Sequence, residues 1–264
     1  MITQIQNHLP GDHPWQNHIY WFETIDSTNT RAKEMAAGGA AHGTVLIAEH
    51  QTGGRGRMGR SFHSPAGSGI YMSVLLRPAC AAQALMHRTG ATAVAACAGI
   101  EKATGLQPDI KWTNDLVVNR KKLGGILTEL SVKSDGMVDY AIVGIGINCA
   151  QGAGDFPEDI RPIATSLQLC TKKTIDRACV IANILTELDN IRNDLQSVDE
   201  ILSRYRKNCI TLGQEISLVR ADEICHGKAL DINRDGSLIV EFPDGHVETV
   251  NSGEVSIRGM YGYV

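Results

Sequence analysis

Three arginines lie close together in a glycine-rich segment, where their side chains could neutralise an anion. The segment reads Gln51-Thr-Gly-Gly-Arg-Gly-Arg-Met-Gly-Arg60, and the arginines are Arg55, Arg57 and Arg60. Glycines let backbone N–H groups turn toward one point, which is a common way to bind an anion. Guanidinium groups add forked donors that match phosphate and carboxylate. The segment predicts an anion-binding loop, although a flexible basic surface loop would have the same composition.

The glycines of this segment match the spacing of a dinucleotide-binding fingerprint, but their surroundings do not. Gly54, Gly56 and Gly59 satisfy G-x-G-x-x-G. That fingerprint needs a helix that starts at the glycines and an acidic residue about twenty positions later. Here Pro65 and further glycines follow, and no Asp or Glu stands between residues 50 and 100. The Gly-Lys-Ser/Thr of a Walker A loop is also missing. A nicotinamide-dependent oxidoreductase is therefore disfavoured.

A second group of charged residues follows at 111–122. Lys111-Trp-Thr-Asn-Asp115 is separated by a few residues from Lys122-Leu-Gly-Gly-Ile-Leu127. If the two stretches form a hairpin, then Lys111, Asp115 and Lys122 converge on one face. Solvated strand lysines beside a turn asparagine would produce the same pattern without any chemistry.

Both groups must be positioned by a mixed α+β domain. We expect strands at 19–24, 44–50, 70–77, 109–119, 124–132 and 140–148, and helices at 27–37, 83–104 and 176–206, the last with room for one break. Residues 1–18 are predicted to be an irregular polar lead-in, and 151–163 a mobile loop. From residue 212 short strands alternate with turn signals, which predicts a separate small barrel. We therefore place one domain at 1–210 and another at 211–264.

Composition narrows the class of protein further. The 264 residues are 43% hydrophobic and 20% charged, as in an ordinary globular protein, and the net charge is −4. The basic balance of a nucleic-acid binder is absent. Seven scattered cysteines without a C-x-x-C pair argue against a disulfide framework or a zinc site. With no secretory signal or apolar span, we expect a cytoplasmic protein with reduced thiols.

Five motifs, taken together, resemble those of the biotin protein ligases. In order they are S-T-N (27–29), G-R-G-R-x-G-R (54–60), K-W-x-N-D (111–115), K-L-G-G-I-L (122–127) and G-I-G-I-N (144–148). The resemblance implies a mixed β-sheet catalytic domain backed by helices, of the class II synthetase and biotin/lipoate ligase type, followed by an SH3-like barrel. It also implies a two-step reaction: biotin and MgATP form biotinyl-5′-AMP, and a carrier lysine then takes the biotin.

The same resemblance implies roles for individual residues. The residues expected to bind biotin are Ser27, Thr28, Asn29, Gln51, Gly54, Arg55, Arg57, Lys122, Gly125, Leu127 and Gly144. Those expected to bind ATP are Arg57, Arg60, Lys111, Asn114, Asp115, Lys122, Asn148 and Arg258. Lys122, Arg57, Lys111 and Asp115 are the expected catalytic residues, and Asp115 also the expected contact to magnesium. More ordinary explanations remain open, since Ser27 could simply cap a helix and Gly144 could serve close packing.

Three positions depart from the family pattern. Thr113 stands where the family usually has proline, Met58 where a basic residue is frequent, and Phe62 where tryptophan is common. None of them removes a reactive group.

Two alternatives to a biotin ligase also remain: a lipoate or octanoate ligase or transferase of the same fold, and a non-catalytic biotin sensor.

The resemblance implies partners as well. The expected acceptor is a biotin carboxyl carrier protein, from acetyl-CoA carboxylase or a related biotin-dependent carboxylase, and the expected state is a monomer or homodimer. Some family members carry an N-terminal DNA-binding domain and act as repressors. Only about twenty residues precede the first expected strand here. We therefore expect a ligase that binds neither nucleic acid nor membrane, with ATP and Mg²⁺ as its only co-substrate and metal.

Overall fold

The chain folds around one seven-stranded mixed sheet. The computed structural model describes residues 1–81, 88–193, 198–220, 223–251 and 256–259. The sheet has the order β1-β2-β3-β7-β6-β5-β4, in which the β1–β2 pair is parallel and every other pair antiparallel. Its strands are β1 (Ile19–Ile25), β2 (Thr44–Gln51), β3 (Gly69–Leu76), β4 (Asp109–Lys111), β5 (Asp115–Val118), β6 (Lys121–Val132) and β7 (Val138–Asn148). The predicted mixed sheet is confirmed.

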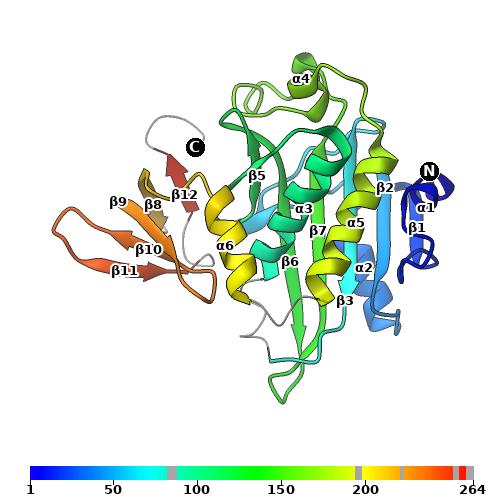
Figure 1. The fold of residues 1–264 in the computed structure, drawn as a ribbon, viewed down its shortest axis with the longest axis horizontal. Coiled ribbons are helices and arrows are strands. Elements are labelled where there is room, and N and C mark those ends of the chain that lie inside the picture. Colours follow the sequence, from blue (N-terminus) through cyan, green and yellow to red (C-terminus); the bar gives the residue numbers. More distant parts are fainter. Residues whose placement is uncertain (82–87, 194–197, 221–222, 252–255, 260–264) are drawn as a thin grey trace.

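Helices cover both faces of this sheet. α3 (Arg88–Thr104) and α5 (Arg177–Asn193) lie side by side on one face, as Figure 1 shows, while α2 (Thr28–Ala37) packs on β3 and β7. Strand residues alternate between these layers, so Ile47 joins the core under α3 and α5 whereas Leu46 packs with Ala32 of α2. The place of a strand residue in this alternation therefore decides on which face of the sheet its side chain lies.

The last part of the chain forms a second, smaller sheet beside α6 (Val198–Asn208). Its order is β11-β10-β9-β8-β12, antiparallel throughout. The strands are β8 (Glu215–Arg220), β9 (Glu223–Ile232), β10 (Leu238–Glu241), β11 (Val247–Val250) and β12 (Ser256–Gly259). Figure 1 shows this sheet at the end of the molecule opposite to α1 and β1. The predicted small antiparallel unit is confirmed, while its boundary at residue 211 stays a prediction.

Side chains connect the small sheet to the large one. Arg206 of α6 donates to the Asp231 carboxylate at 2.7 Å and to the carbonyl of Ile232. The Trp112 indole N–H donates to the carbonyl of Gly236 at 2.9 Å. The turn after β4 is therefore fastened to the β9–β10 turn of the small sheet.

The prediction for the first eighteen residues is wrong. Residues Ile2–His8 form helix α1, which packs on α5. Apolar residues at positions 2, 5 and 9 give this polar stretch one apolar face, and Ile5 is buried on it. Trp15, after the helix, is buried as well. Pro10 follows the end of the helix instead of preventing it.

Two other expectations need correction. The single strand expected at 109–119 is two short strands, because residues 112–114 turn the chain back on itself between β4 and β5. The loop expected at 151–163 contains a short helical turn, Ala153–Asp155, and is followed by α4 (Leu167–Thr171). For the long helix expected at 176–206 the structure describes α5 and α6, and residues 194–197 between them lie outside the described residues, as do residues 83–87 of the helix expected at 83–104. Among the described residues, none of the helices is long and apolar enough to cross a membrane.

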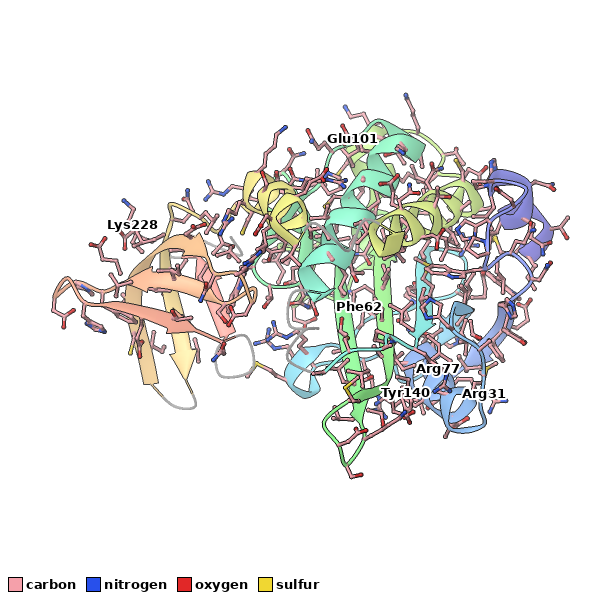
Figure 2. All side chains as sticks on the ribbon, turned by 60° about the horizontal axis from the view of Figure 1, so that its bottom comes forward. Arg31, Phe62, Arg77, Glu101, Tyr140 and Lys228 are labelled. Carbon is pink, nitrogen blue, oxygen red and sulfur yellow. The ribbon has the colours of Figure 1, made fainter. Side chains whose placement is uncertain are left out.

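The contact between α3 and α5 can be tested at Gly99. A Cβ atom added at Gly99 would lie 2.7 Å from backbone atoms of Ile184, which cannot rotate away. We expect Gly99→Val to lower the free energy of unfolding by about 1–3 kcal/mol, the usual cost of overpacking. Urea denaturation followed by circular dichroism measures it. The matched control is Glu101→Val, on the exposed side of the same helix (Figure 2), where a loss equally large would contradict the packing argument.

Candidate active site

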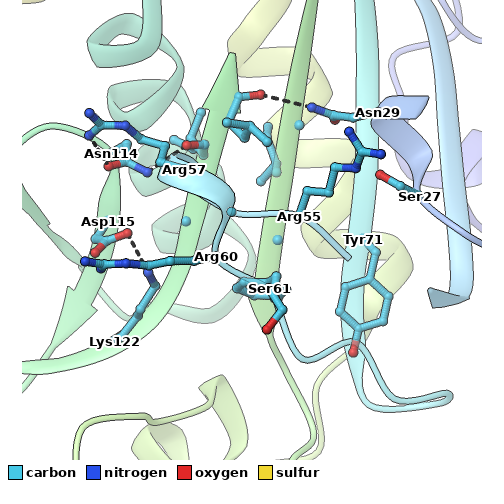
Figure 3. A pocket seen from close by; sticks show the side chains of 18 of the residues that line it. Ser27, Asn29, Arg55, Arg57, Arg60, Ser61, Tyr71, Asn114, Asp115 and Lys122 are labelled. Carbon is cyan, nitrogen blue, oxygen red and sulfur yellow. Dashed lines mark hydrogen bonds and ion pairs between the residues drawn. The ribbon is translucent and has the colours of Figure 1, made fainter. Parts of the chain in front are cut away.

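A cavity of about 590 Å³ lies against the seven-stranded sheet and under a loop of residues 54–62, which we call the arginine loop (Figure 3). Most of the residues selected from the sequence line it: Ser27, Thr28, Asn29, Gln51, Arg55, Arg57, Arg60, Lys111, Asn114, Asp115, Lys122, Gly125, Leu127 and Gly144. The motifs are spread over a hundred positions of the chain, yet they meet in one place. Their roles toward a ligand stay predictions.

Strand register builds the floor of this cavity. Residues directly opposite each other in antiparallel strands share one face of the sheet. One such row crosses β3, β7, β6, β5 and β4 through Tyr71, Gly146, Gly125, Asp115 and Lys111. The two glycines in the middle of the row put no side chain between Tyr71 and Asp115. The strands therefore place no side chain of their own between the aromatic residue and the charged residues of this row.

Neighbouring side chains use the space above two of the strand glycines. A Cβ at Gly144 would lie 2.2 Å from the side-chain oxygen of Asn29, and a Cβ at Gly146 would lie 2.7 Å from the Phe62 ring. Phe62 in turn meets Tyr71 edge to face, with ring centroids 6.3 Å apart. Close packing is thus a real role of Gly144, and it places Asn29 at the cavity.

Lys122 and Asp115 form the charged wall. The Lys122 ammonium lies 2.7 Å from the Asp115 carboxylate, which confirms that the hairpin brings them together. The Lys122 backbone is held as well, since its N–H donates to the Ile163 carbonyl at 2.7 Å and its carbonyl accepts from the Thr165 N–H at 2.8 Å. Segment 163–165 therefore fixes the position from which Lys122 reaches the cavity.

Arg57 extends from the arginine loop to the turn after β4. One of its terminal nitrogens donates to the Thr113 hydroxyl at 2.8 Å and to the Asn114 side-chain oxygen at 3.0 Å. Burial lowers the pKa of the Arg57 guanidinium from its ordinary value, and the charge of Asp115 opposes that shift. The loop closes on itself, because the Gly56 N–H donates to the Arg60 carbonyl and the Phe62 N–H to the Gly54 carbonyl.

The other end of the cavity is built mainly from neutral polar groups, and the Arg55 side chain points toward Asn29 and Ser27 there (Figure 3). The Gln51 side-chain oxygen accepts from the Thr28 N–H at 2.8 Å and from its hydroxyl at 3.1 Å. The Ser73 hydroxyl lies 2.8 Å from the Thr28 hydroxyl and 2.6 Å from the Asn29 side-chain oxygen. Ser27 occupies the N-cap position of α2 without a side-chain capping bond. Donors and acceptors are therefore concentrated at this end (Figure 3).

Glu129 supports this polar end from beside the cavity. Its carboxylate accepts from the Asn29 amide at 2.8 Å and lies 2.5 Å from the Lys33 ammonium. Burial acts to raise the pKa of Glu129, but the hydrogen bonds from Lys33 and Asn29 outweigh it and lower the pKa. The carboxylate stays ionised and fixes the orientation of Asn29.

A second cavity of about 620 Å³ lies on the other side of the arginine loop. It shares Arg55, Arg57 and Arg60 with the first cavity, and its far side is formed by residues 235–237 of the small sheet. The arginine loop is therefore a partition between two open spaces.

Three predicted residues are not among those that line the first cavity. Gly54 packs behind the loop, where a Cβ would lie 2.4 Å from the Phe62 carbonyl oxygen. Asn148 is buried beside it and donates to the Thr165 carbonyl at 3.0 Å. Arg258 lies on β12, and its side chain is outside the part of the chain that the structure describes.

Several residues at the site were not selected from the sequence, above all Tyr71, Ser73 and Glu129. Tyr71 lines the cavity, and its hydroxyl donates to the Pro65 carbonyl at 2.9 Å. Ser73 and Tyr71 alternate with apolar residues along β3, which was the available signal for a polar face. Glu129 had none, because its partner Asn29 stands a hundred positions earlier.

The protein supplies few ligands for a metal. Within the described residues no group of three or more His, Cys, Asp or Glu could hold a metal ion, and Asp115 is the one acidic residue lining the first cavity. Magnesium commonly binds through one or two carboxylates and substrate phosphates. The residues present therefore fit magnesium carried in by a nucleotide.

Comparison with known proteins places the chain in a family. Residues 21–148 match the model of the biotin/lipoate A/B protein ligase family, and residues 211–258 match the biotin protein ligase C-terminal domain. The bifunctional ligase/repressor BirA of Bacillus spizizenii is 38% identical over 242 residues, which cover 91% of this chain and 74% of BirA. The chain belongs to the biotin protein ligase family. The ligase is also 31% identical to the biotin–[acetyl-CoA-carboxylase] ligase of Mycobacterium tuberculosis, with 87% and 85% of the two chains covered.

Solved structures agree with this assignment. The biotin protein ligase from Aquifex aeolicus in complex with biotin and ATP superposes on the ligase with a TM-score of 0.77 at 31% identity. The match covers 92% of this chain and 99% of that one. The resemblance seen in the motifs is thereby confirmed for the fold and the family.

The role of Gly144 at the polar end can be tested by substitution. In Gly144→Ala the new Cβ displaces Asn29 from its place at the cavity, so we expect the Kd for biotin to rise roughly tenfold, equivalent to about 1.4 kcal/mol. Isothermal titration calorimetry measures it. Gly154→Ala is the control, because a Cβ there meets nothing within 4 Å. An unchanged Kd in Gly144→Ala would contradict the prediction that biotin binds next to Gly144.

Proposed function

We propose that this ligase forms biotinyl-5′-AMP from biotin and ATP in the first cavity and then transfers the biotin to a lysine of a carrier protein. One observation carries the proposal: a single cavity joins the neutral hydrogen-bonding side chains of α2 and β2 to the cations of the arginine loop and of Lys111 and Lys122. Biotin has matching ends, an uncharged ureido ring and a carboxylate. The Aquifex aeolicus relative, solved with biotin and ATP, supports the choice of substrates.

The polar end would hold the ureido ring. A ureido group has two N–H donors and a carbonyl acceptor, and Ser27, Thr28, Asn29 and Gln51 supply complementary groups at the cavity. Leu127 and the open surface at Gly144 would face the apolar part of biotin. The carboxylate then points toward Lys122 and Arg57.

The first step joins two anions, so cations must lower their repulsion. A biotin carboxylate oxygen attacks the α-phosphorus of ATP, the bond to the β-phosphate oxygen breaks, and pyrophosphate leaves. Lys122 and Arg57 would stabilise the charge between the carboxylate and the α-phosphate, with Arg60 and Lys111 toward the other phosphates. Asn148 and Arg258 are proposed for the nucleotide side. A carboxylate is already ionised near neutral pH, so no general base is required.

Asp115 would act by holding Lys122 and by meeting the magnesium that arrives with ATP. Its carboxylate is paired with the Lys122 ammonium at 2.7 Å, which fixes the direction of that ammonium. Magnesium would supply further positive charge to the phosphates. The protein's own cations do the rest of the neutralisation.

The second step transfers the acyl group. The neutral amine of the carrier lysine attacks the acyl carbon of the mixed anhydride, AMP leaves, and the amine loses a proton as the amide forms. The adenylate must be kept from water until then, and the arginine loop would cover it.

The acceptor is proposed to be the biotin carrier of acetyl-CoA carboxylase. Relatives from Mycobacterium tuberculosis and Paracoccus denitrificans are named biotin–[acetyl-CoA-carboxylase] ligases. We also propose that these 264 residues bind no operator DNA, because their net charge is −4. A specific footprint on DNA would refute that part.

The substrate can be decided by ATP–pyrophosphate exchange with biotin, lipoate, octanoate or no acid. We expect exchange with biotin alone, because the polar end matches a ureido ring and neither of the other acids has one. Exchange with lipoate or octanoate instead would assign the chain to that activity of the same fold. Exchange with none of the acids would refute the adenylation step.

The role of Lys122 can be separated from binding. In Lys122→Ala we expect biotin-dependent exchange to fall about 100-fold or more, as happens when a charge-stabilising group is removed, while the Kd for biotin changes only a few-fold. Lys121→Ala is the matched control, since Lys121 is the exposed neighbour on the same strand. Equal losses of binding and exchange in Lys122→Ala would contradict the central position given to this ammonium.

A further inference from the structure

The turn at residues 112–114 contacts the arginine loop through the side chain of Thr113. The Thr113 hydroxyl accepts a hydrogen bond from an Arg57 terminal nitrogen at 2.8 Å. The side chain of Thr113 therefore ties a residue of the arginine loop to the turn after β4.

The backbone around Thr113 is held from several sides. Its carbonyl accepts from the hydroxyl of Tyr205 on α6 at 2.9 Å. The N–H of Trp112 donates to the Thr211 hydroxyl at 2.9 Å, and the indole of Trp112 reaches the Gly236 carbonyl. The Asn114 N–H₂ donates to the Ile126 carbonyl at 2.8 Å. Because these anchors lie on four different parts of the fold, the hydroxyl that Thr113 presents has a fixed place.

Two of the acceptors that hold Arg57 are neutral, the Thr113 hydroxyl and the Asn114 side-chain oxygen. A hydroxyl and an amide oxygen orient a guanidinium without cancelling its charge, whereas Asp115 neutralises much of the charge of Lys122. A cation that is oriented in advance stabilises developing negative charge without having to reorganise during the reaction. The hydrogen bonds from Thr113 and Asn114 therefore orient the Arg57 guanidinium without adding a negative charge of their own.

We propose that Thr113 is a positioning residue for Arg57, holding the guanidinium over the site of the adenylate and slowing the loss of that intermediate. The proposal rests on the proposed function for its catalytic consequence. Thr113 itself touches no reacting atom. Its effect passes through Arg57, and the arginine loop keeps its closed position for longer because two neutral acceptors bind Arg57 on the sheet side.

The test compares Thr113→Val with Thr113→Ser in the full-length protein. Valine keeps the shape and removes the hydroxyl, whereas serine keeps the hydroxyl and removes the methyl group. Losing one hydrogen bond to a charged group should speed the loss of preformed biotinyl-5′-AMP about tenfold, equivalent to about 1.4 kcal/mol. We expect this in Thr113→Val and a rate close to wild type in Thr113→Ser, with KM for biotin and Tm little changed in both.

A double-mutant comparison shows whether the effect passes through Arg57. In an Arg57→Ala background, Thr113→Val should add nothing, because the donor is already gone. An undiminished effect in that background would overturn the proposal, and so would a wild-type rate in Thr113→Val or equal losses in the valine and serine variants.

A second readout needs no substrate and separates this proposal from the proposed function. In ¹⁵N NMR spectra of the ligand-free protein, restricted rotation should give Arg57 resolved terminal N–H signals, assigned with the Arg57→Ala spectrum. We expect these signals in the wild type and Thr113→Ser and their loss in Thr113→Val. Identical signals in all three would overturn the contact, whereas a wild type that shows the contact but no biotin-dependent exchange would refute the function alone.

Discussion

Mutual repulsion among cations is the constraint on which the rest of the site depends. Five cationic side chains, those of Arg55, Arg57, Arg60, Lys111 and Lys122, line one cavity, and within the described residues Asp115 is the one carboxylate lining it. Like charges confined at such distances destabilise the folded state unless something holds them. The protein uses the rigidity of the sheet for this purpose. Lys111 and Asp115 are opposed residues of adjacent strands, and the backbone of Lys122 is hydrogen-bonded on both sides.

The solution separates two kinds of cation. Lys122 is paired with a carboxylate and belongs to a strand, so its position changes little. Arg57 belongs to a loop, and two of its hydrogen bonds go to neutral oxygens of the turn after β4. The same cavity thereby combines a cation carried by a strand and paired with a carboxylate with a cation carried by a loop.

Local pattern was enough to predict the parts of the site that are close in sequence. The convergence of Asp115 and Lys122 could be predicted because a tight turn between β5 and β6 joins their strands, and the arginine loop because glycine and arginine alternate in it. Ser73 and Glu129 could not, since their partners come from pairings between distant segments whose register no local pattern reveals.

Helix α1 was missed for a different reason: its apolar face is only one residue wide per turn and lies among polar neighbours. The turn at Trp112 divided a strand that β-propensity alone would have continued.

The bond between Trp112 and Gly236 spans 124 positions of the chain, and this has a consequence for the order of events on the ribosome. At common elongation rates, about 5–20 residues per second, Gly236 is added roughly 6–25 seconds after Trp112. During that interval the seven-stranded sheet can assemble, but the turn that presents Thr113 and Asn114 to Arg57 lacks the anchors of Tyr205, Thr211 and Gly236 until each of these residues is made. We expect the nascent chain to build this region in two stages, first the strand-borne charges and last the full anchoring of the turn. A polypeptide released before the small sheet is made would have the first stage without the second.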